Sequence, residues 1–439
     1  MKIHAVGGYG LVGRNMSIYE FDKEAVAVDM GLHLDNYIAY QEAEPNAEFV
    51  DREMLSKIGA IPDLNPVQHI KHKVKAIVLT HGHLDHIGGV QFLEDQFDAP
   101  IIGTPLTIAI LRTLVADRKS KLKNRLISVK PGATYMISEN LKVEFIRASH
   151  SIPETAILAF HTPQGVYVHA TDFKFDAHPG LGDRTDIKRL GELKGSVRAV
   201  VIDTLNADEE RKTPSERIAQ EMLRDVLLSE EMDGKGIIVS TFSSHLARLK
   251  EIEDVGRKMN RKVVFIGRSL DKYMKAGEDA GVTKFNSQII GFSRRVASRL
   301  KQIEKEGKEK YLIVATGHQG EPGSILDRIA RKDLKFQLKP DDAIVFSCRV
   351  IPAPQNILNR EKLDNTLRSE GVRLFTGVHV SGHLSQTDHR FFFELVKPEK
   401  IIPTHSDFKK AMDLMPVIKK LGYAHEDLIL LSEGDTQDI

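Results

Sequence analysis

The feature that most constrains this chain is a dense group of histidine and aspartate residues that directly follows an apolar strand. After the apolar run AIVLT comes HGHLDH, which places His81, His83, Asp85 and His86 within six residues. Imidazole and carboxylate together are ligands that zinc and similar divalent ions bind in proteins. His81 and His83 can point into one site, whereas Asp85 and His86 enter the next turn. One short segment can therefore supply ligands to two metal ions about 3.5–4 Å apart, the spacing of hydrolytic two-metal sites.

Four residues cannot complete two metal sites, so further ligands must come from elsewhere in the chain. His150, Asp172 and His405 each come just after an apolar strand in the sequence pattern, and Asp29 and Asp203 also stand at strand ends. The ends of strands at one edge of a sheet commonly carry active-site groups. We therefore expect His150, Asp172 and His405 to complete the metal centre.

Composition limits the remaining interpretations. A length of 439 residues predicts two or three domains. Lys and Arg number 62 against 61 Asp and Glu, and this net charge of +1 excludes a global electrostatic pull on nucleic acid but leaves a local basic groove open. The single cysteine, Cys348, excludes an internal disulfide and fits a reducing cytosol. No apolar stretch approaches the ~18 residues of a membrane span, so we predict a cytoplasmic protein without membrane contact.

The pattern of strands and helices changes twice along the chain. Short strands and turns fill the first half, and TPSE then predicts a helix start with Thr213 as N-cap, Pro214 at the first helical position and Glu216 closing a capping box. From there to Cys348 strands alternate with helices, which indicates a parallel sheet. After about Asp364 the earlier pattern returns. The sequence predicts a first domain split into residues 1–207 and 365–439, with a second domain, residues 208–364, inserted in it.

A glycine pattern near the N-terminus resembles a dinucleotide-binding motif. Gly8, Gly10 and Gly13 form GxGxxG after a strand, but the following NMSIYEF alternates like another strand. Dinucleotide binding needs a helix that begins at the glycines, so that its amides face the pyrophosphate. We therefore expect a tight turn here rather than a nucleotide site.

Several motifs together resemble one family. GGYGLVGRNM, HGHLDHIGG, TFSSH, TGHQGEPGS, FSCRVIP, HVSGHLSQ and IIPTHSD run across nearly the whole chain. They are similar to the β-CASP branch of the metallo-β-lactamase superfamily, and within it to ribonuclease J in its short, archaeal-type form. The resemblance implies an α/β fold, in which a metallo-β-lactamase αββα sandwich carries a β-CASP domain built on a parallel sheet.

The resemblance also implies a ligand set and roles for the site residues. One metal goes to His81, His83, His150 and Asp172, and the second to Asp85, His86, Asp172 and His405, with Asp172 shared. The implied cofactor is two zinc ions per chain, with manganese or magnesium as alternatives. Asp203 would orient the metal ligands or the attacking water, beside the catalytic ligand Asp85. His383 would contact the scissile phosphate and protonate the leaving 3′ oxygen.

The loops of the inserted domain independently suggest a phosphate site. They follow the carboxyl ends of predicted parallel strands, the edge at which open α/β sheets bind ligands. Hydroxyl groups, guanidinium groups and backbone amides in such loops can cradle a phosphate. The candidate residues are Ser243, Ser244, His245, Arg268, Gly320 and Arg349, with Ser381, Gly382 and His383 from the other domain.

The expected function is a zinc-dependent ribonuclease that hydrolyses RNA phosphodiester bonds in RNA decay or maturation. We expect a 5′→3′ exonuclease that acts on single-stranded RNA and prefers 5′-monophosphate ends. Three alternatives stay open at this point: an endoribonuclease of the mRNA 3′-end-processing type, a DNA-acting β-CASP nuclease, and a catalytically inactive RNA-binding subunit. A homodimer is left open as the assembly.

Overall fold

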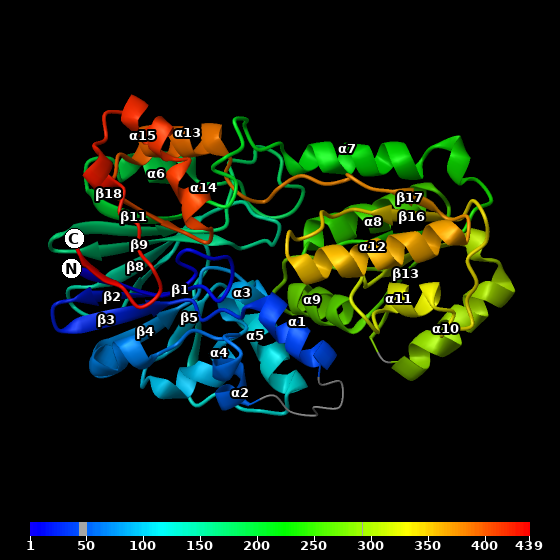
Figure 1. Cartoon of the computed structure of the whole chain (residues 1–439), viewed down its shortest axis with the longest axis horizontal. Helices are drawn as coiled ribbons and strands as arrows, with labels where there is room; N and C mark the ends of the chain where they lie inside the picture. Colours follow the sequence, from blue (N-terminus) through cyan, green and yellow to red (C-terminus); the bar gives the residue numbers. More distant parts are fainter. Residues whose placement is uncertain (44–50, 292) are drawn as a thin grey trace. The chain divides into compact units, whose positions relative to one another are not determined.

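A computed structural model describes residues 1–43, 51–291 and 293–439 of the chain. The chain divides into two compact units. The first contains residues 1–177, 182–213 and 381–439, and the second contains residues 178–181 and 214–380. The first unit is therefore discontinuous in sequence, and the second is inserted in it (Figure 1).

The first unit contains two sheets. One has the strand order β19-β1-β2-β3-β4-β5-β6 and the other the order β18-β11-β10-β9-β8-β7. The first is built from β1 (Lys2–Gly7), β2 (Met16–Phe21), β3 (Glu24–Val28), β4 (Val74–Val78), β5 (Ile101–Gly103), β6 (Leu126–Ser128) and β19 (Thr436–Asp438). The second is built from β7 (Thr134–Met136), β8 (Lys142–Arg147), β9 (Ala156–Thr162), β10 (Gly165–Ala170), β11 (Val197–Asp203) and β18 (Lys400–Thr404).

The two sheets pack face to face because their strands are apolar on the inner side. Tyr19 and Val78 of the first sheet share one core with Phe145, Leu158 and Val201 of the second. A separate core on the other face of the second sheet includes Phe392, Phe393 and Ile418. The helices on that face are α6 (Ile187–Glu192), α13 (Gln386–Val396) and α15 (Met415–Lys420), with α14 (Phe408–Met412) and the short η5 (His425–Asp427) nearby in sequence.

Further helices follow the strands of the first sheet. They are α1 (Leu34–Ala43), α2 (Arg52–Lys57), η1 (Asn65–Lys73), α3 (Leu84–Ile87), α4 (Val90–Leu93), η2 (Glu94–Gln96) and α5 (Pro105–Asp117). Of these, α5 packs against β5 and η1 packs against β1 and β3. The first unit is therefore an αββα sandwich (Figure 1).

The second unit is built on a six-stranded sheet with the order β14-β13-β15-β12-β16-β17. Every strand pair in this sheet is parallel. The strands are β12 (Ile237–Ser240), β13 (Lys262–Ile266), β14 (Gln288–Ile290), β15 (Tyr311–Ala315), β16 (Ala343–Phe346) and β17 (Arg373–Phe375). The helices are α7 (Glu216–Leu227), α8 (Leu246–Lys258), α9 (Arg268–Asp279), α10 (Ser293–Glu306), α11 (Ile325–Ala330) and α12 (Pro354–Ser369), with the short η3 (Glu230–Met232) and η4 (Lys308–Lys310).

Three details differ from the sequence prediction. The boundary expected at residue 364 falls inside α12, and the second unit continues to Val380 because β17 pairs with β16. The first boundary lies at residue 213 rather than 207. The helix expected from Asp85 onward is broken into α3 and α4, because the amide of Gly89, which would donate to the carbonyl of Asp85 in a continuous helix, donates to the carbonyl of Met30 at 2.8 Å instead.

The predicted capping box at TPSE is also wrong. The N-cap of α7 is Ser215, whose hydroxyl accepts from the amide of Arg217. The hydroxyl of Thr213 instead donates to the carbonyl of His383 at 2.8 Å, and the carboxylate of Glu216 binds Arg248. His383 and Arg248 therefore bind the two side chains that a capping box would have used. Among the described residues, no helix is both long enough and apolar enough to cross a membrane.

Candidate metal centre

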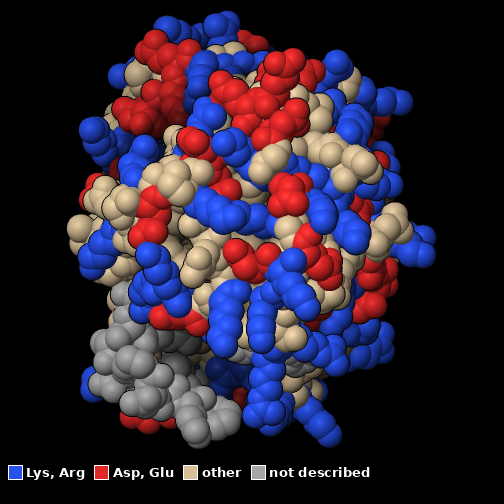
Figure 2. Space-filling view, turned by 90° about the vertical axis from the view of Figure 1, so that its right-hand side faces the viewer, with Lys and Arg blue, Asp and Glu red and all other residues tan. Residues whose placement is uncertain are grey.

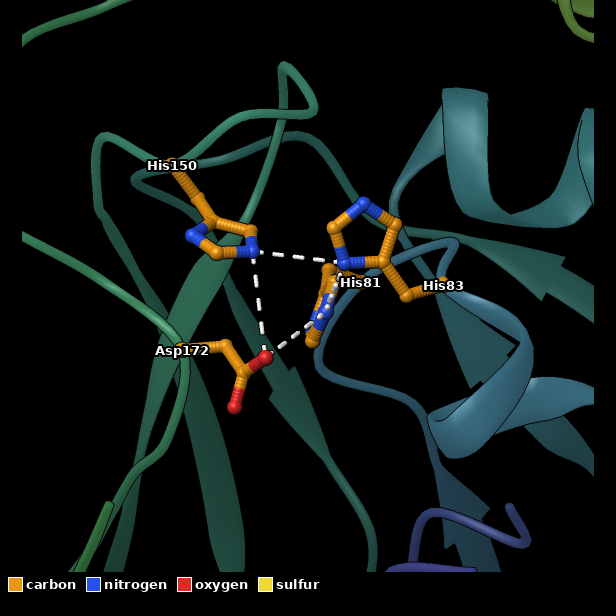
Figure 3. A group of neighbouring side chains, drawn as sticks. All are labelled: His81, His83, His150 and Asp172. Carbon is orange, nitrogen blue, oxygen red and sulfur yellow. Dashed lines mark hydrogen bonds and ion pairs between the residues drawn. The ribbon is translucent and has the colours of Figure 1, made fainter. Parts of the chain in front are cut away.

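A compact group of four metal-binding side chains lies at strand ends of the first unit. The nitrogen Nε2 of His81 lies 3.1 Å from Nδ1 of His83, and Nε2 of His150 lies 3.3 Å from that same Nδ1. The oxygen Oδ2 of Asp172 lies 3.7 Å from Nε2 of both His81 and His150. Figure 3 shows the four side chains converging from separate segments of the unit. Their donor atoms surround one point.

A second group lies on the other side of Asp172. Here Oδ2 of Asp85 lies 3.7 Å from Nε2 of His86 and 3.8 Å from Nε2 of His405. The other carboxylate oxygen of Asp172, Oδ1, lies 3.4 Å from His86 and 4.0 Å from His405. The two oxygens of Asp172 therefore face one group each, as a ligand shared between two metal ions would.

The backbone at three of these strand ends is in the left-handed region. Asp29, Asp172 and His405 have φ values of 58°, 54° and 56°. Asp29 follows β3, Asp172 follows β10 and His405 follows β18. For residues other than glycine this conformation is uncommon and costs about 1 kcal/mol or more each. The chain tolerates this strain at the same end of the fold where the donor atoms meet, which is where functional sites commonly concentrate it.

Asp29 and Thr80 fix two of the imidazole rings. The carboxylate of Asp29 accepts from Nδ1 of His86 at 2.7 Å and from the amide and hydroxyl of Thr80, both at 2.8 Å. The Thr80 oxygen in turn lies 2.9 Å from Nδ1 of His81. When Nδ1 of a histidine carries the proton and donates it, the lone pair of Nε2 is left for a metal. These contacts therefore set both rings in the ligand orientation.

Asn15 and Gly382 do the same for two further rings. The side-chain oxygen of Asn15 lies 3.0 Å from Nδ1 of His405, and the carbonyl of Gly382 lies 2.9 Å from Nδ1 of His150. His83 is turned the other way, with Nδ1 toward the group and Nε2 3.4 Å from the hydroxyl of Ser151. The roles of Asn15 and Thr80 were not predicted from the sequence. A polar residue directly beside a ligand or closing a glycine turn is the signal that could have found them.

Burial sets the protonation of the cluster. Desolvation lowers the pKa of His81 and His83 well below the ordinary value, and it lowers the pKa of His150 to about 3. For His86, burial acts in the same direction, but the charges of Asp172, Asp85 and Asp29 outweigh it and raise its pKa. Burial would raise the pKa of Asp172, yet the neighbouring His405 and His86 outweigh it and lower that pKa. Three histidines are therefore neutral and the shared carboxylate is ionised, which is the protonation state that metal binding requires.

His383 lies beside both groups and is paired with Asp203. Its Nδ1 lies 2.7 Å from Oδ2 of Asp203, whose other oxygen accepts from the amide of Leu205. The ring stacks on that of His405 with centroids 5.6 Å apart, and it meets the ring of His150 edge-on at 5.2 Å. Burial opposes protonation of His383, but the charges of Asp203 and Asp172 outweigh it and raise its pKa to about 9. The ring is therefore a cation that a carboxylate holds in place.

Ser381 and Gly382, which sequence analysis assigned to phosphate binding, have structural contacts of their own. The hydroxyl of Ser381 accepts from the side chain of Asn206 at 2.7 Å and from the amide of His383 at 3.2 Å. A Cβ atom at Gly382 would lie 2.7 Å from the ring of His150. Both residues therefore shape the loop that carries His383.

Comparison with known proteins identifies the family. Residues 55–224 match the model of the beta-lactamase superfamily domain, residues 234–365 that of the ribonuclease J beta-CASP domain, and residues 372–426 that of the Zn-dependent metallo-hydrolase RNA specificity domain. Ribonuclease J of Methanocaldococcus jannaschii is 42% identical over 99% of this chain and 98% of its own length. Ribonuclease J of Pyrococcus abyssi is 41% identical over 96% of this chain and 93% of its own length.

The chain belongs to the ribonuclease J family. The family models and the two units confirm the predicted fold class, a metallo-β-lactamase sandwich with an inserted β-CASP domain. A crystal structure of a protein of unknown function from Enterococcus faecalis covers 99% of both chains with a TM-score of 0.66. Because its sequence is only 14% identical, this likeness shows the fold alone.

The donor set of this ribonuclease J family member fits a divalent metal. Zinc lies about 2.0–2.1 Å from a histidine nitrogen, so two ligands of a tetrahedral zinc ion lie about 3.3 Å apart. Distances of 3.1–3.7 Å among His81, His83, His150 and Asp172 agree with that value. The buried Oδ1 of Asp172 has no hydrogen-bond partner among the described residues. A second cation bound to this oxygen would supply the missing partner. The residues present therefore fit one metal in each group.

The other residues predicted to bind phosphate lie in the second unit, at the carboxyl ends of its parallel strands. Ser243, Ser244 and His245 follow β12, Arg268 follows β13, Gly320 follows β15 and Arg349 follows β16. The hydroxyl of Ser243 lies 2.8 Å from that of Ser269, which joins the first two of these loops. His245 lies 3.4 Å from Glu216, whereas Arg268 and Arg349 are exposed. The structure therefore brings these loops to one sheet edge, and their role in ligand binding stays a prediction.

Proposed function

We propose that this chain is a metal-dependent ribonuclease that hydrolyses RNA phosphodiester bonds as a 5′→3′ exonuclease. The observation that carries the proposal is the pair of donor groups joined through Asp172, in a chain of the ribonuclease J family. The RNA specificity domain matched at residues 372–426 supports single-stranded RNA as the substrate.

We propose two zinc ions as the cofactor, one in each donor group. The first ion is assigned to His81, His83, His150 and Asp172, and the second to Asp85, His86, His405 and Asp172. These residues would hold divalent ions that, when bound, would supply an activated water and neutralise the charge that develops on the phosphate. The neutral state of His81, His83 and His150 and the ionised state of Asp172 support binding of a divalent cation.

His383 and Asp203 are assigned to the leaving group. A histidine whose pKa is raised to about 9 carries its proton at neutral pH, so it can hold the scissile phosphate and donate a proton to the departing 3′ oxygen. Asp203 accepts from Nδ1, which leaves Nε2–H as the proton that the substrate meets. We therefore assign Asp203 to the positioning of His383 rather than to the metals.

The loops of the second unit are proposed to bind the 5′-terminal phosphate. Ser243, Ser244 and Arg268 offer hydroxyl and guanidinium donors at the sheet edge, and such donors favour a doubly charged phosphate. A 5′-hydroxyl end would leave these donors without their partner, and a triphosphate adds charge and bulk. We therefore expect faster attack on a 5′-monophosphate end than on either of the others.

The test is digestion of one RNA labelled at either end, with the 5′ group varied. The proposal predicts that 5′-labelled RNA releases labelled mononucleotide at once, without a ladder of intermediates. Arg268→Gln should weaken the preference for the monophosphate, whereas Lys362→Gln, an exposed cation on α12, should leave it unchanged. If a circular RNA is cut as fast as a linear 5′-monophosphate RNA, the exonuclease assignment fails.

A further inference from the structure

The charges of this chain are divided unevenly between its two units. The second unit contains 30 Lys and Arg residues against 23 Asp and Glu residues, a net charge of +7. The first unit contains 32 against 38, a net charge of −6. The overall value of +1 therefore conceals a basic unit that can attract a polyanion.

Helix α10 concentrates part of this charge on one stripe. Its inner face is fixed by Val296, Leu300 and Ile303, which are buried in the core of the second unit. Helical geometry then places Arg294, Lys301 and Lys305 together on the outward side, seven and four residues apart, and all three are exposed. With a rise of 1.5 Å per residue they span about 16 Å along the helix. We call Arg294, Lys301 and Lys305 the α10 stripe.

The acidic residues of the same helix are held by partners outside the stripe. Glu304 accepts from the backbone amide of Gln337 at 3.2 Å. Glu306 accepts from the hydroxyl of Tyr311 and from the side chain of Gln302. Both carboxylates are therefore hydrogen-bonded to neighbouring groups.

The cations of the stripe differ from these carboxylates in their surroundings. In the described part of the chain, none of the three stripe residues forms an ion pair with a carboxylate. Figure 2 shows Lys and Arg side chains gathered in the lower part of this face of the molecule, at the level where α10 lies in Figure 1, and a mixture of both signs higher up. The stripe is therefore a track of positive charge at the surface.

We infer that the α10 stripe is an accessory binding surface for the phosphate backbone of single-stranded RNA. Long, exposed cationic side chains without fixed partners suit contacts that are independent of sequence, because phosphates position a strand without specifying its bases. The identity of the polyanion as RNA rests on the proposed function. The stripe would hold substrate strands by charge alone, in addition to whatever the catalytic groups and the sheet-edge loops bind.

The test compares two triple variants that remove the same charge. Arg294→Gln, Lys301→Gln and Lys305→Gln together neutralise the stripe and keep good helix formers. Lys258→Gln, Lys362→Gln and Arg368→Gln neutralise three exposed cations on α8 and α12, and serve as the matched control. Both triples are made in the full chain carrying Asp85→Ala, and the RNA is checked for integrity. Affinity for a long single-stranded RNA is then measured by fluorescence anisotropy at several salt concentrations.

The inference predicts a loss of affinity and of salt dependence in the stripe variant only. Each phosphate contact of a single strand contributes about −0.7 to the slope of log K against log salt, so the loss of three contacts should make the slope less negative by about 2. An Arg294→Lys variant, which keeps the charge, should behave like the parent. Equal losses in the two triples, or no loss in the stripe variant, would overturn the inference. The inference would also be overturned if the stripe variant lost binding to polyglutamate but kept its affinity for RNA, since the partner would then be an acidic protein. Because binding is measured without cleavage, failure of the nuclease assignment would be seen separately.

Discussion

Two buried clusters of charged side chains, one in each unit, differ in whether their hydrogen bonds are complete. In the first unit, the metal-centre cluster brings three histidines of lowered pKa around an ionised Asp172, one of whose oxygens has no hydrogen-bond partner among the described residues. In the second unit, Arg248 is fully buried and both oxygens of Glu216 accept from its guanidinium group, at 2.7 and 2.9 Å. Its remaining nitrogen donates to Ser347 and to the carbonyl of Val378.

The difference separates a binding site from a structural pair. Around Arg248 every nitrogen of the guanidinium group has an acceptor, and α7, α8 and β16 are thereby tied together. Around Asp172 the ligand atoms of His81, His83 and His150 converge with the carboxylate, all within 4.8 Å of one another, and neutral imidazoles offer lone pairs. A buried cluster that satisfies itself stabilises the fold, whereas one left with surplus acceptors requires a cation.

The largest expected effect follows from Asp172→Asn, which keeps the left-handed backbone tolerable and removes the shared charge. Bound metal should fall to less than half of the parent value, and cleavage should fall by at least about 10³-fold, since both ions lose a ligand. Elemental analysis and RNA digestion measure these two quantities. A variant with full metal content and unchanged turnover would show that the carboxylate does not join the two groups.

His383→Ala tests whether His383 is one of the metal ligands. His383 can form a donor group with Asp172 and His405, so its role has to be separated from that of a ligand. We expect turnover to fall by about 10²–10⁴-fold, the scale of general acid–base groups, with metal content unchanged. Loss of bound metal in this variant would make His383 a ligand and contradict the assignment.

Arg248→Met should act on stability alone. Removing one partner leaves Glu216 buried without its counter-ion, which typically costs about 3–5 kcal/mol in the free energy of unfolding. Denaturant unfolding measures this cost, and the metal content per folded chain should stay unchanged. The double variant with Glu216→Leu should be less destabilised than Arg248→Met. If the double variant is the less stable of the two, the pair is not a self-contained structural element.

The smallest expected effect is on how the folding stability depends on pH. Burial acts to raise the pKa of Glu216, but the charges of His245 and Arg248 outweigh it and lower that pKa below the ordinary 4.5. The folded state therefore binds fewer protons than the unfolded state, so the stabilisation is present above pH 4.5 and is lost as the pH falls below it. The stability difference between the parent and Glu216→Gln should be largest near neutral pH and should narrow in acid. If the stability difference between the two proteins stays constant down to the pH of acid unfolding, the pKa of Glu216 does not contribute to the pH dependence of stability.

The residues proposed from the sequence as metal ligands meet in the structure because each group of them follows an apolar strand, and their role as ligands stays a prediction. HGHLDH after β4, His150 after β8, Asp172 after β10 and His405 after β18 all carry that local signal. Thr80 lies directly beside His81 in the sequence, but the contact of Asn15 with His405 is harder to predict, because a hydrogen bond between segments far apart in the chain depends on the tertiary fold. The same reason explains the wrong cap at Thr213, whose hydroxyl is engaged by the carbonyl of His383 far along the chain.

The boundary at residue 364 could not be read from the sequence for a different reason. The pattern of alternating strands and helices weakens after β16, but α12 runs on to Ser369 and β17 adds a parallel strand at the sheet edge. A short edge strand such as RLF is indistinguishable from a loop without its partner. The glycine-rich turn that begins at Gly8, by contrast, leads to strand β2 at Met16 as predicted, and the carbonyl of Gly8 accepts from the amide of His405 at 2.7 Å.

The central claim is that the first unit holds two metal ions that are needed for cleavage. The most direct measurement is elemental analysis of the full chain purified without chelator, combined with RNA digestion before and after the metal is removed. The account predicts about two divalent ions per chain, with zinc the main element, loss of cleavage on removal and recovery on return of the metal. Protein that contains no metal and cleaves RNA at the full rate would contradict it.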